Sequence, residues 1–363
     1  FQGRAETVGS GMAGSGGLVE VSGLQNLQFT GMVDTGGGTL LLDPVDVTLG
    51  AGGIAWNTIS TALAANNVVV HTADLGAVTA GAGNVTLNAT GGTDMMYNSA
   101  FDFSVFAHND IIVNRNVRIQ NGGTGNVNLV AGWDGNGLTL VTPISGTPVI
   151  GNVTGPGDQT ATSATEGAID AAFIEAGVWG DDGDIITSSS GNSRIEIGSA
   201  AGETNLYGDN IFLFGSFTNN QHTHIGLYFQ NNPTVGNPAA ATGDIRVQAK
   251  DAILLDAGNG VRHRSQVQIG HGRRNQGSNA INASGDVLVD AGGAFVARAG
   301  QHESYIKIGH GGRNINGVNM GQDGDLIRVT GSSIFLDQSP VNLQRQLHPH
   351  WKWRFSGPRR SSR

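Results

Sequence analysis

The chain has 363 residues, a net charge of −9, 58 Gly and no Cys. The missing Cys excludes a disulfide framework, thiolate zinc sites and thiol catalysis. The negative charge argues against nucleic acid as a partner, because its binding depends on neutralising phosphates. The sequence has no apolar run of about 18 residues, so we expect no membrane span. Abundant Gly with few charged residues favours many short strands joined by tight turns.

Residues 16–53 form a series of short segments in which apolar side chains alternate with polar ones. Leu18, Val19 and Val21 precede a Ser-Gly turn, and a later segment, Leu40 to Leu42, ends at Asp43-Pro44. Alternation of this kind, with turns about every 8–12 residues, indicates an all-β architecture.

Two segments are predicted to be short helices inserted among the strands. The first covers 59–67 and the second 163–177, where Ser163 and Glu166 form a capping box and Gly177 occupies a C-cap position. Each is followed by a strand-rich stretch, which suggests two sub-repeats, 16–141 and 160–341, joined by a loop at 142–165.

The second half of the chain repeats two motifs. Gly-Asp turns begin at Gly243, Gly285 and Gly324, and the Ile-Gly-His-Gly sequence ends the segments 266–272 and 305–311, so that His271 and His310 are 39 residues apart. Repetition of short strands and turns is typical of a solenoid. We expect one elongated β-helix over 1–341, with two rungs of strand per repeat. About fifteen rungs at a spacing of about 4.8 Å predict a rod roughly 70 Å long.

The repeat turns are the candidate site positions: Gly270, His271, Gly272, Gly309, His310 and Gly311. Two rungs per repeat predict that the two histidines lie roughly 10 Å apart, too far to share a metal ion. We therefore interpret them as turn residues. His222 and His224 share one face of a strand, but the sequence offers no third ligand. No metal or cofactor is expected.

Asn is concentrated in or beside the turns, where its side chain tolerates the left-handed conformation and can form ladders between stacked rungs. Examples in the first half are Asn114, Asn116, Asn121, Asn126 and Asn128.

The last segment, 342–363, is a basic tail that is predicted to be disordered. An alternative is an arm that binds an acidic polymer or a lipid surface, since Trp351 and Trp353 lie among its arginines.

Several stretches resemble the filamentous-haemagglutinin-like adhesins, the large exoproteins of Gram-negative two-partner secretion. They are GGLVEVSG at 16–23, LLLDPVDVTL at 40–49, ISTALAANNVVVHT at 59–72 and IIVNRNVRI at 111–119, together with the Ile-Gly-His-Gly repeats. The resemblance implies a right-handed parallel β-helix, export through an outer-membrane pore and a role at the cell surface. It implies no common catalytic residues. The family's N-terminal secretion domain is not in this chain, so we expect a piece of a longer protein.

We expect a secreted, non-enzymatic β-helical arm that adheres to glycans or to host or neighbouring cell surfaces. The alternative is an extracellular filament built by head-to-tail stacking of open β-helix ends. A lesser alternative is a polysaccharide-active enzyme, for which Asp251 and Asp256 with Arg262 and Arg264 are the available charged groups.

Overall fold

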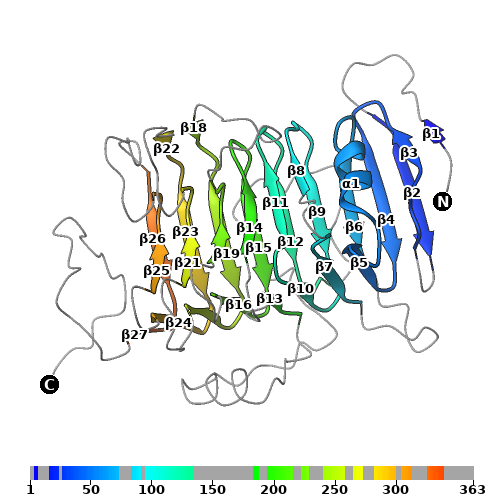
Figure 1. Cartoon of the computed structure of the whole chain (residues 1–363). Coiled ribbons are helices and arrows are strands. Elements are labelled where there is room, and N and C mark those ends of the chain that lie inside the picture. The colour runs from blue at the N-terminus through cyan, green and yellow to red at the C-terminus, as the bar shows by residue number, and fades with distance from the viewer. Residues whose placement is uncertain are drawn as a thin grey trace, which may run out of the picture.

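The computed structural model describes residues 4–6, 16–23, 27–72, 83–90, 95–133, 183–187, 194–215, 222–228, 240–257, 265–272, 282–299, 304–311 and 325–338. These residues form an elongated stack of short strands that follow one another in chain order from the N-terminal to the C-terminal end (Figure 1). Every strand pairing is parallel, and three long sheets run along the stack. The predicted all-β parallel β-helix is confirmed.

The first sheet has nine strands, which are β2 (Leu18–Gly23), β4 (Thr39–Pro44), β6 (Asn67–His71), β9 (Phe103–Phe106), β12 (Val127–Val130), β15 (Thr204–Gly208), β19 (Ile245–Ala249), β23 (Val287–Ala291) and β26 (Ile327–Thr330). The second has eight, which are β5 (Val47–Gly50), β7 (Val85–Asn88), β10 (Ile111–Val113), β13 (Ile185–Thr187), β16 (Ile211–Phe214), β20 (Ile253–Asp256), β24 (Ala294–Ala299) and β27 (Ser333–Gln338).

The third sheet has six strands, which are β8 (Met95–Tyr97), β11 (Arg118–Asn121), β14 (Arg194–Ser199), β17 (His222–Ile225), β21 (Gln266–Ile269) and β25 (Tyr305–Ile308). Two small parallel pairs complete the strands, β1 (Arg4–Glu6) with β3 (Met32–Asp34) and β18 (Ala240–Ala241) with β22 (Asn282–Ala283). From β9 onward the chain visits the first, second and third sheets in turn, so each coil of the solenoid has three faces.

The core runs along the axis of the stack and is built by alternation within each strand. In the first sheet Val105, Leu129, Leu206, Val247 and Val289 occupy equivalent positions in successive strands, and all are buried. Aliphatic side chains therefore stack directly upon one another from coil to coil. Burial of this continuous apolar column supplies the main stabilising free energy of the fold.

The first predicted helix is present, three residues earlier than expected, as α1 (Trp56–Ala62). Trp56, Ile59 and Ala62 are its buried residues, which is the i, i+3 spacing of one helix face. The helix contacts β3 and β8, so it occupies the third-sheet position of its coil in place of a strand. The second predicted helix, the 142–165 loop and the basic tail lie outside the described residues, and these predictions remain untested.

The predicted number of rungs is wrong. The two Ile-Gly-His-Gly segments lie on β21 and β25, which pair directly with Gln266 opposite Tyr305. One repeat is therefore one coil and not two, because each coil contains three strands and the connections between them. With nine strands in the longest sheet, the described stack is roughly 40 Å long at about 4.8 Å per strand.

A ladder of polar side chains holds the corner that precedes the second sheet. In each coil the backbone N–H at this corner donates to the side-chain Oδ1 of the equivalent residue one coil earlier, at 2.8–3.1 Å. The ladder, called the second-sheet ladder below, runs through Asp46, Asn84, Asp110, Asp184, Asn210 and Ala252. It satisfies backbone donors that would otherwise be buried without a partner.

Replacing Asp184 tests this ladder. Burial raises the pKa of Asp184 well above its usual value, so the folded chain disfavours the charged form at neutral pH. We expect Asp184→Asn to keep the Oδ1 acceptor and to raise the denaturation midpoint at pH 7.5, with the gain shrinking as the pH falls through the raised folded value. Asp184→Ala, which leaves the N–H and Nδ2 of Asn210 without their acceptor, should cost about 1–3 kcal/mol. Equal midpoints for both variants would contradict the ladder.

Candidate functional site

The predicted repeat-turn residues lie at the corner that follows the third sheet. Gly270 and Gly309 come directly after β21 and β25 and have φ values of +144° and +118°. A Cβ on Gly270 would lie 2.1 Å from the carbonyl oxygen of Gly309 in the next coil. Glycine is therefore required here both by the backbone conformation and by the close approach of successive coils. Gly272 and Gly311 complete the same two turns.

His271 and His310 stack on one another with ring centroids 5.2 Å apart and ring planes 8° apart. The predicted separation of roughly 10 Å is wrong for the reason given above, since one repeat is a single coil. The two rings stack because they follow directly paired strands of neighbouring coils, so they lie about one strand spacing apart.

Both nitrogens of each ring are engaged by the backbone. The N–H of Leu227 donates to Nδ1 of His271 at 3.0 Å, and the N–H of His271 donates to Nδ1 of His310 at 3.1 Å. Each Nε2 then donates to a carbonyl oxygen, that of Gly243 at 2.7 Å and that of Gly285 at 2.8 Å. This pattern requires the neutral Nε2–H tautomer. The histidines are structural, because neither ring keeps a lone pair for a metal or a reacting group.

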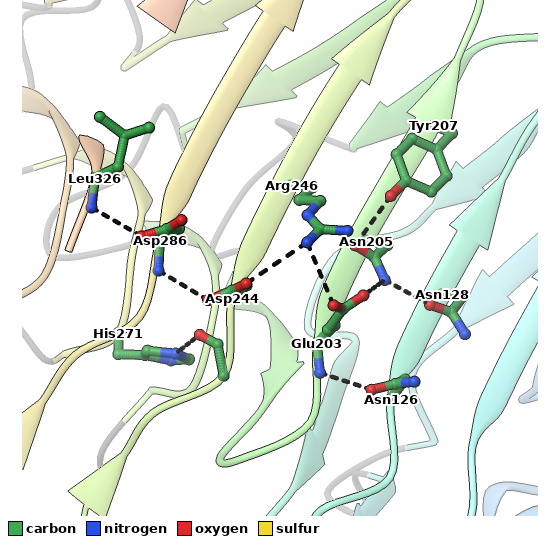
Figure 2. Close-up of polar contacts among 11 residues, drawn as sticks. Asn126, Asn128, Glu203, Asn205, Tyr207, Asp244, Arg246, His271, Asp286 and Leu326 are labelled. Carbon is green, nitrogen blue, oxygen red and sulfur yellow. Dashed lines mark hydrogen bonds and ion pairs between the residues drawn. The ribbon is translucent and has the colours of Figure 1, made fainter. Parts of the chain in front are cut away.

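The two sequence motifs meet at this corner. Gly243 and Gly285, which accept from the histidines, begin the Gly-Asp turns whose aspartates form a first-sheet ladder (Figure 2). The N–H of Asp286 donates to Oδ1 of Asp244 at 2.9 Å, and the N–H of Leu326 donates to Oδ1 of Asp286 at 2.8 Å. The Gly-Asp and Ile-Gly-His-Gly motifs are thus hydrogen-bonded to each other, and together they hold the corner between the third and first sheets.

The polar side chains on the outer side of the first sheet bind one another (Figure 2). Arg246 lies 3.4 Å from a carboxylate oxygen of Glu203 and 3.6 Å from one of Asp244. Nδ2 of Asn205 donates to Oδ1 of Asn128 at 2.9 Å. These groups bind one another across neighbouring coils, which is a stabilising arrangement and offers little to a ligand.

The outer side of the third sheet differs from the rest of the surface. In four successive strands both outward positions carry polar side chains, while Ile, Val or Thr points inward. The strands read Arg-Ile-Glu-Ile, His-Thr-His-Ile, Gln-Val-Gln-Ile and Tyr-Ile-Lys-Ile. We call the following outward residues, with Arg118 of the preceding strand, the third-sheet polar face: Arg118, Arg194, Glu196, His222, His224, Gln266, Gln268, Tyr305 and Lys307.

Glu196 anchors the N-terminal part of this face. Its carboxylate accepts from Nε of Arg118 at 2.7 Å and lies 2.8 Å from Nε2 of His222. Burial alone raises the pKa of Glu196, but the hydrogen bonds and positive charges of His222 and Arg118 outweigh burial and lower the pKa below its usual value. The ring of His222 stacks on Tyr228 with centroids 4.4 Å apart.

The next two strands carry buried polar groups whose hydrogen bonds are incomplete. Neither nitrogen of His224 and neither amide atom of Gln266 has a hydrogen-bond partner of ordinary geometry in the structure, and Oε1 of Gln268 also lacks one. Burial lowers the pKa of His224 well below its usual value, and repulsion from the charged Lys307 acts in the same direction. His224 is therefore neutral.

The sequence identified only His222 and His224 in this face, and their shared orientation on β17 is confirmed. Among the described residues no group of three or more His, Cys, Asp or Glu side chains is placed to hold a metal ion. The other residues of the face could also have been identified from the sequence, because polar residues alternate with Ile or Val before each Ile-Gly pair.

The charged groups considered for an enzyme are not brought together within the described chain. Asp256 on β20 lies 3.9 Å from Arg298 on the neighbouring β24, while Asp251 is in the turn before β20. Arg262 and Arg264 lie outside the described residues.

The chain matches no known protein family, no curated protein and no solved structure in the three comparisons made. In the described part of the chain, no helix has the length and apolar character needed to cross a membrane.

The histidine corner predicts a loss of stability in acid. Burial, followed by the charge of His310, lowers the pKa of His271 to about 3. Between pH about 6.5 and about 3, His271 is protonated in the unfolded chain but not in the folded chain. The free energy of unfolding therefore decreases as the pH falls through this window, by up to about 1.4 kcal/mol per pH unit. His271→Gln should be less stable than the parent above pH 7, with a deficit that narrows as the pH falls.

Asn66→Ala is the matched control, since it also removes buried hydrogen bonds, to the backbone of Val33 and Thr35, but touches no titrating group. Its deficit should be the same at every pH. Urea midpoints measured between pH 4 and 8 compare the two variants, and parallel curves for His271→Gln and the parent would contradict the assignment.

Proposed function

We propose that this chain is a rigid, non-enzymatic arm of a secreted exoprotein of the filamentous-haemagglutinin-like, two-partner-secretion type, and that it adheres to glycans or cell surfaces. The observation that carries the proposal is the unbroken parallel stack, in which one sheet continues through nine strands over a single apolar column. A stack held at every coil by backbone pairing is stiff, and it displays outward side chains in regular rows. The sequence resemblance supplies the secretion route and the surface location.

The absence of Cys supports the same proposal. A chain that passes unfolded through an outer-membrane pore has to fold afterwards without disulfides formed on the way. Corner ladders and stacked apolar side chains provide stability that needs no oxidant, and they form locally as each coil docks on its neighbour.

Adhesion is tested with the whole chain coupled to fluorescent beads. Beads that carry the folded chain should bind cultured cells or immobilised matrix glycans well above beads that carry albumin. Beads that carry the heat-unfolded chain should lose this binding, because the rows of outward side chains exist only in the stack. The same glycans incubated with the free chain should release no new reducing ends. Release of reducing ends would support the polysaccharide-active alternative, and equal binding of folded and unfolded beads would contradict the proposal.

A second candidate function is self-assembly into a filament, and it rests on the last described coil. Ile327 occupies an inward position of the first sheet, in register with the buried Val287, yet it is 44% exposed. Leu336 on β27 is 59% exposed. At the other end Met32 on β3 is 61% exposed. Apolar surface beside the edges of parallel strands is the surface on which another coil, from the same or a second chain, can stack.

Ile327→Lys tests this second function. If chains stack end to end, sedimentation of the parent should show species that grow with concentration, and Ile327→Lys should remain monomeric because a charge would be buried in the contact. Leu288→Lys is the matched control, since Leu288 points outward from the adjacent strand β23, away from the end of the stack. A parent that stays monomeric up to millimolar concentration would rule out the filament.

A further inference from the structure

Apolar side chains line the outer side of the second sheet in its C-terminal half. One outward row runs through β13, β16, β20 and β24 as Ile186, Phe212, Leu254 and Val296, and Phe214 is the next outward residue of β16. We call these five residues the second-sheet apolar strip. They form a cluster that is separate from the central core, because they point away from the axis of the stack.

The strip is buried, although outward side chains earlier in the same row are not. Thr48, Thr86 and Ile112 precede Ile186 in register on β5, β7 and β10, and each is only half-buried. In contrast, no residue of the strip is more than 7% exposed. The change occurs at β13, which is the first strand after residues 134–182.

The described elements do not supply the cover. The main contacts of the four strip strands are with other strands of the stack, and α1 lies against β3, β6 and β8. Yet β16 reads Ile-Phe-Leu-Phe and β20 reads Ile-Leu-Leu-Asp. Continuous apolar runs of this kind are typical of parallel strands that are covered on both faces. Residues outside the described ranges therefore have to pack on the outer side of the strip.

The chain that joins β12 to β13 contains a segment suited to this role. The segment 163–177 has the sequence pattern of a helix with one apolar face. Its apolar residues recur at the i, i+3, i+4, i+7 spacing: Ile169, Ala172, Phe173 and Ala176. The charged residues Asp170 and Glu175 fall outside this face.

The dimensions of the segment and the strip agree. A helix over 163–177 is roughly 22 Å long at 1.5 Å per residue. The four strands that carry the strip span about 14 Å at about 4.8 Å per interval, so one helix laid across them reaches every residue of the strip. The shorter connections that follow these strands are poor candidates, because 216–221 and 258–264 each hold one large apolar residue and 188–193 and 300–303 hold none.

We propose that segment 163–177 forms a helix that docks on the second-sheet apolar strip, with Ile169 and Phe173 facing the sheet. The strip is then an internal docking surface for this segment of the same chain. The outer side of the helix presents Asp170 and Glu175 to solvent, so a charged surface replaces a contiguous apolar patch that would promote association of chains.

Cysteine labelling tests whether the segment is a helix with one protected face. Because the parent has no Cys, each substitution introduces the single thiol of the chain. In the folded whole chain, the thiol of Ala172→Cys should react with a maleimide at least about tenfold more slowly than in the urea-unfolded chain. The matched control is Ala171→Cys, on the opposite side of the helix, which should react at nearly the unfolded rate. Equal rates for the two folded variants would overturn the proposal.

A second set of variants locates the docking site on the strip. The thiol of Leu254→Cys should be protected in the folded chain, and adding Phe173→Asp should speed its labelling at least about tenfold, because a carboxylate is unfavourable against apolar side chains. Adding Ala171→Asp instead should leave the rate unchanged. The thiol of Leu255→Cys, which points into the central core, should stay protected throughout and so reports that the stack is folded. Protection of Leu254→Cys that persists with Phe173→Asp would mean that a different segment covers the strip, and the proposal would be wrong.

Discussion

The registry of one coil on the next is the constraint on which the whole structure depends. In a parallel stack the backbone groups of each strand are satisfied only by the coils on either side, so every corner has to recur at the same position in each coil. The second-sheet ladder shows how strictly this is kept. The N–H of Asp184 donates to Asp110, 74 residues earlier, although residues 134–182 intervene between them. Chain length between corners is thus free to vary, while the corner itself is not.

The same constraint explains why histidine and aspartate recur together. A glycine with positive φ follows the third-sheet strand, and the histidine after it donates to the carbonyl of the glycine at the preceding first-sheet corner, 25–28 residues earlier in the chain. Aspartate then accepts the N–H of the following coil. Each residue satisfies a backbone group that the turn itself leaves unpaired, so the motif recurs for a structural reason, and the neutral histidine is a consequence of its burial.

Fold class and strand faces could be predicted from the sequence because alternation is a local property. The side-chain ladders of Asn were also anticipated, as Asn126 shows by accepting from Glu203, and Asn116 has the expected positive φ. The number of strands per coil could not be predicted. Equivalent residues in neighbouring coils are separated by 24 residues at Ser104 and Asn128, by 77 at Asn128 and Asn205, and by 42 at Asp244 and Asp286. The length of a repeat in the sequence therefore does not show how many strands the repeat contains.

The third-sheet polar face is not required by this architecture. At the equivalent outward positions of the second sheet, Phe212, Leu254 and Val296 stack on one another and form a small apolar cluster. The β-helix therefore accepts apolar side chains on the outer side of a sheet, where they carry no cost of unmatched hydrogen bonds. Buried His224 and Gln266 do carry that cost, about 1–3 kcal/mol for each unsatisfied group. The third sheet therefore keeps polar side chains at a cost in stability that the second sheet avoids with apolar ones.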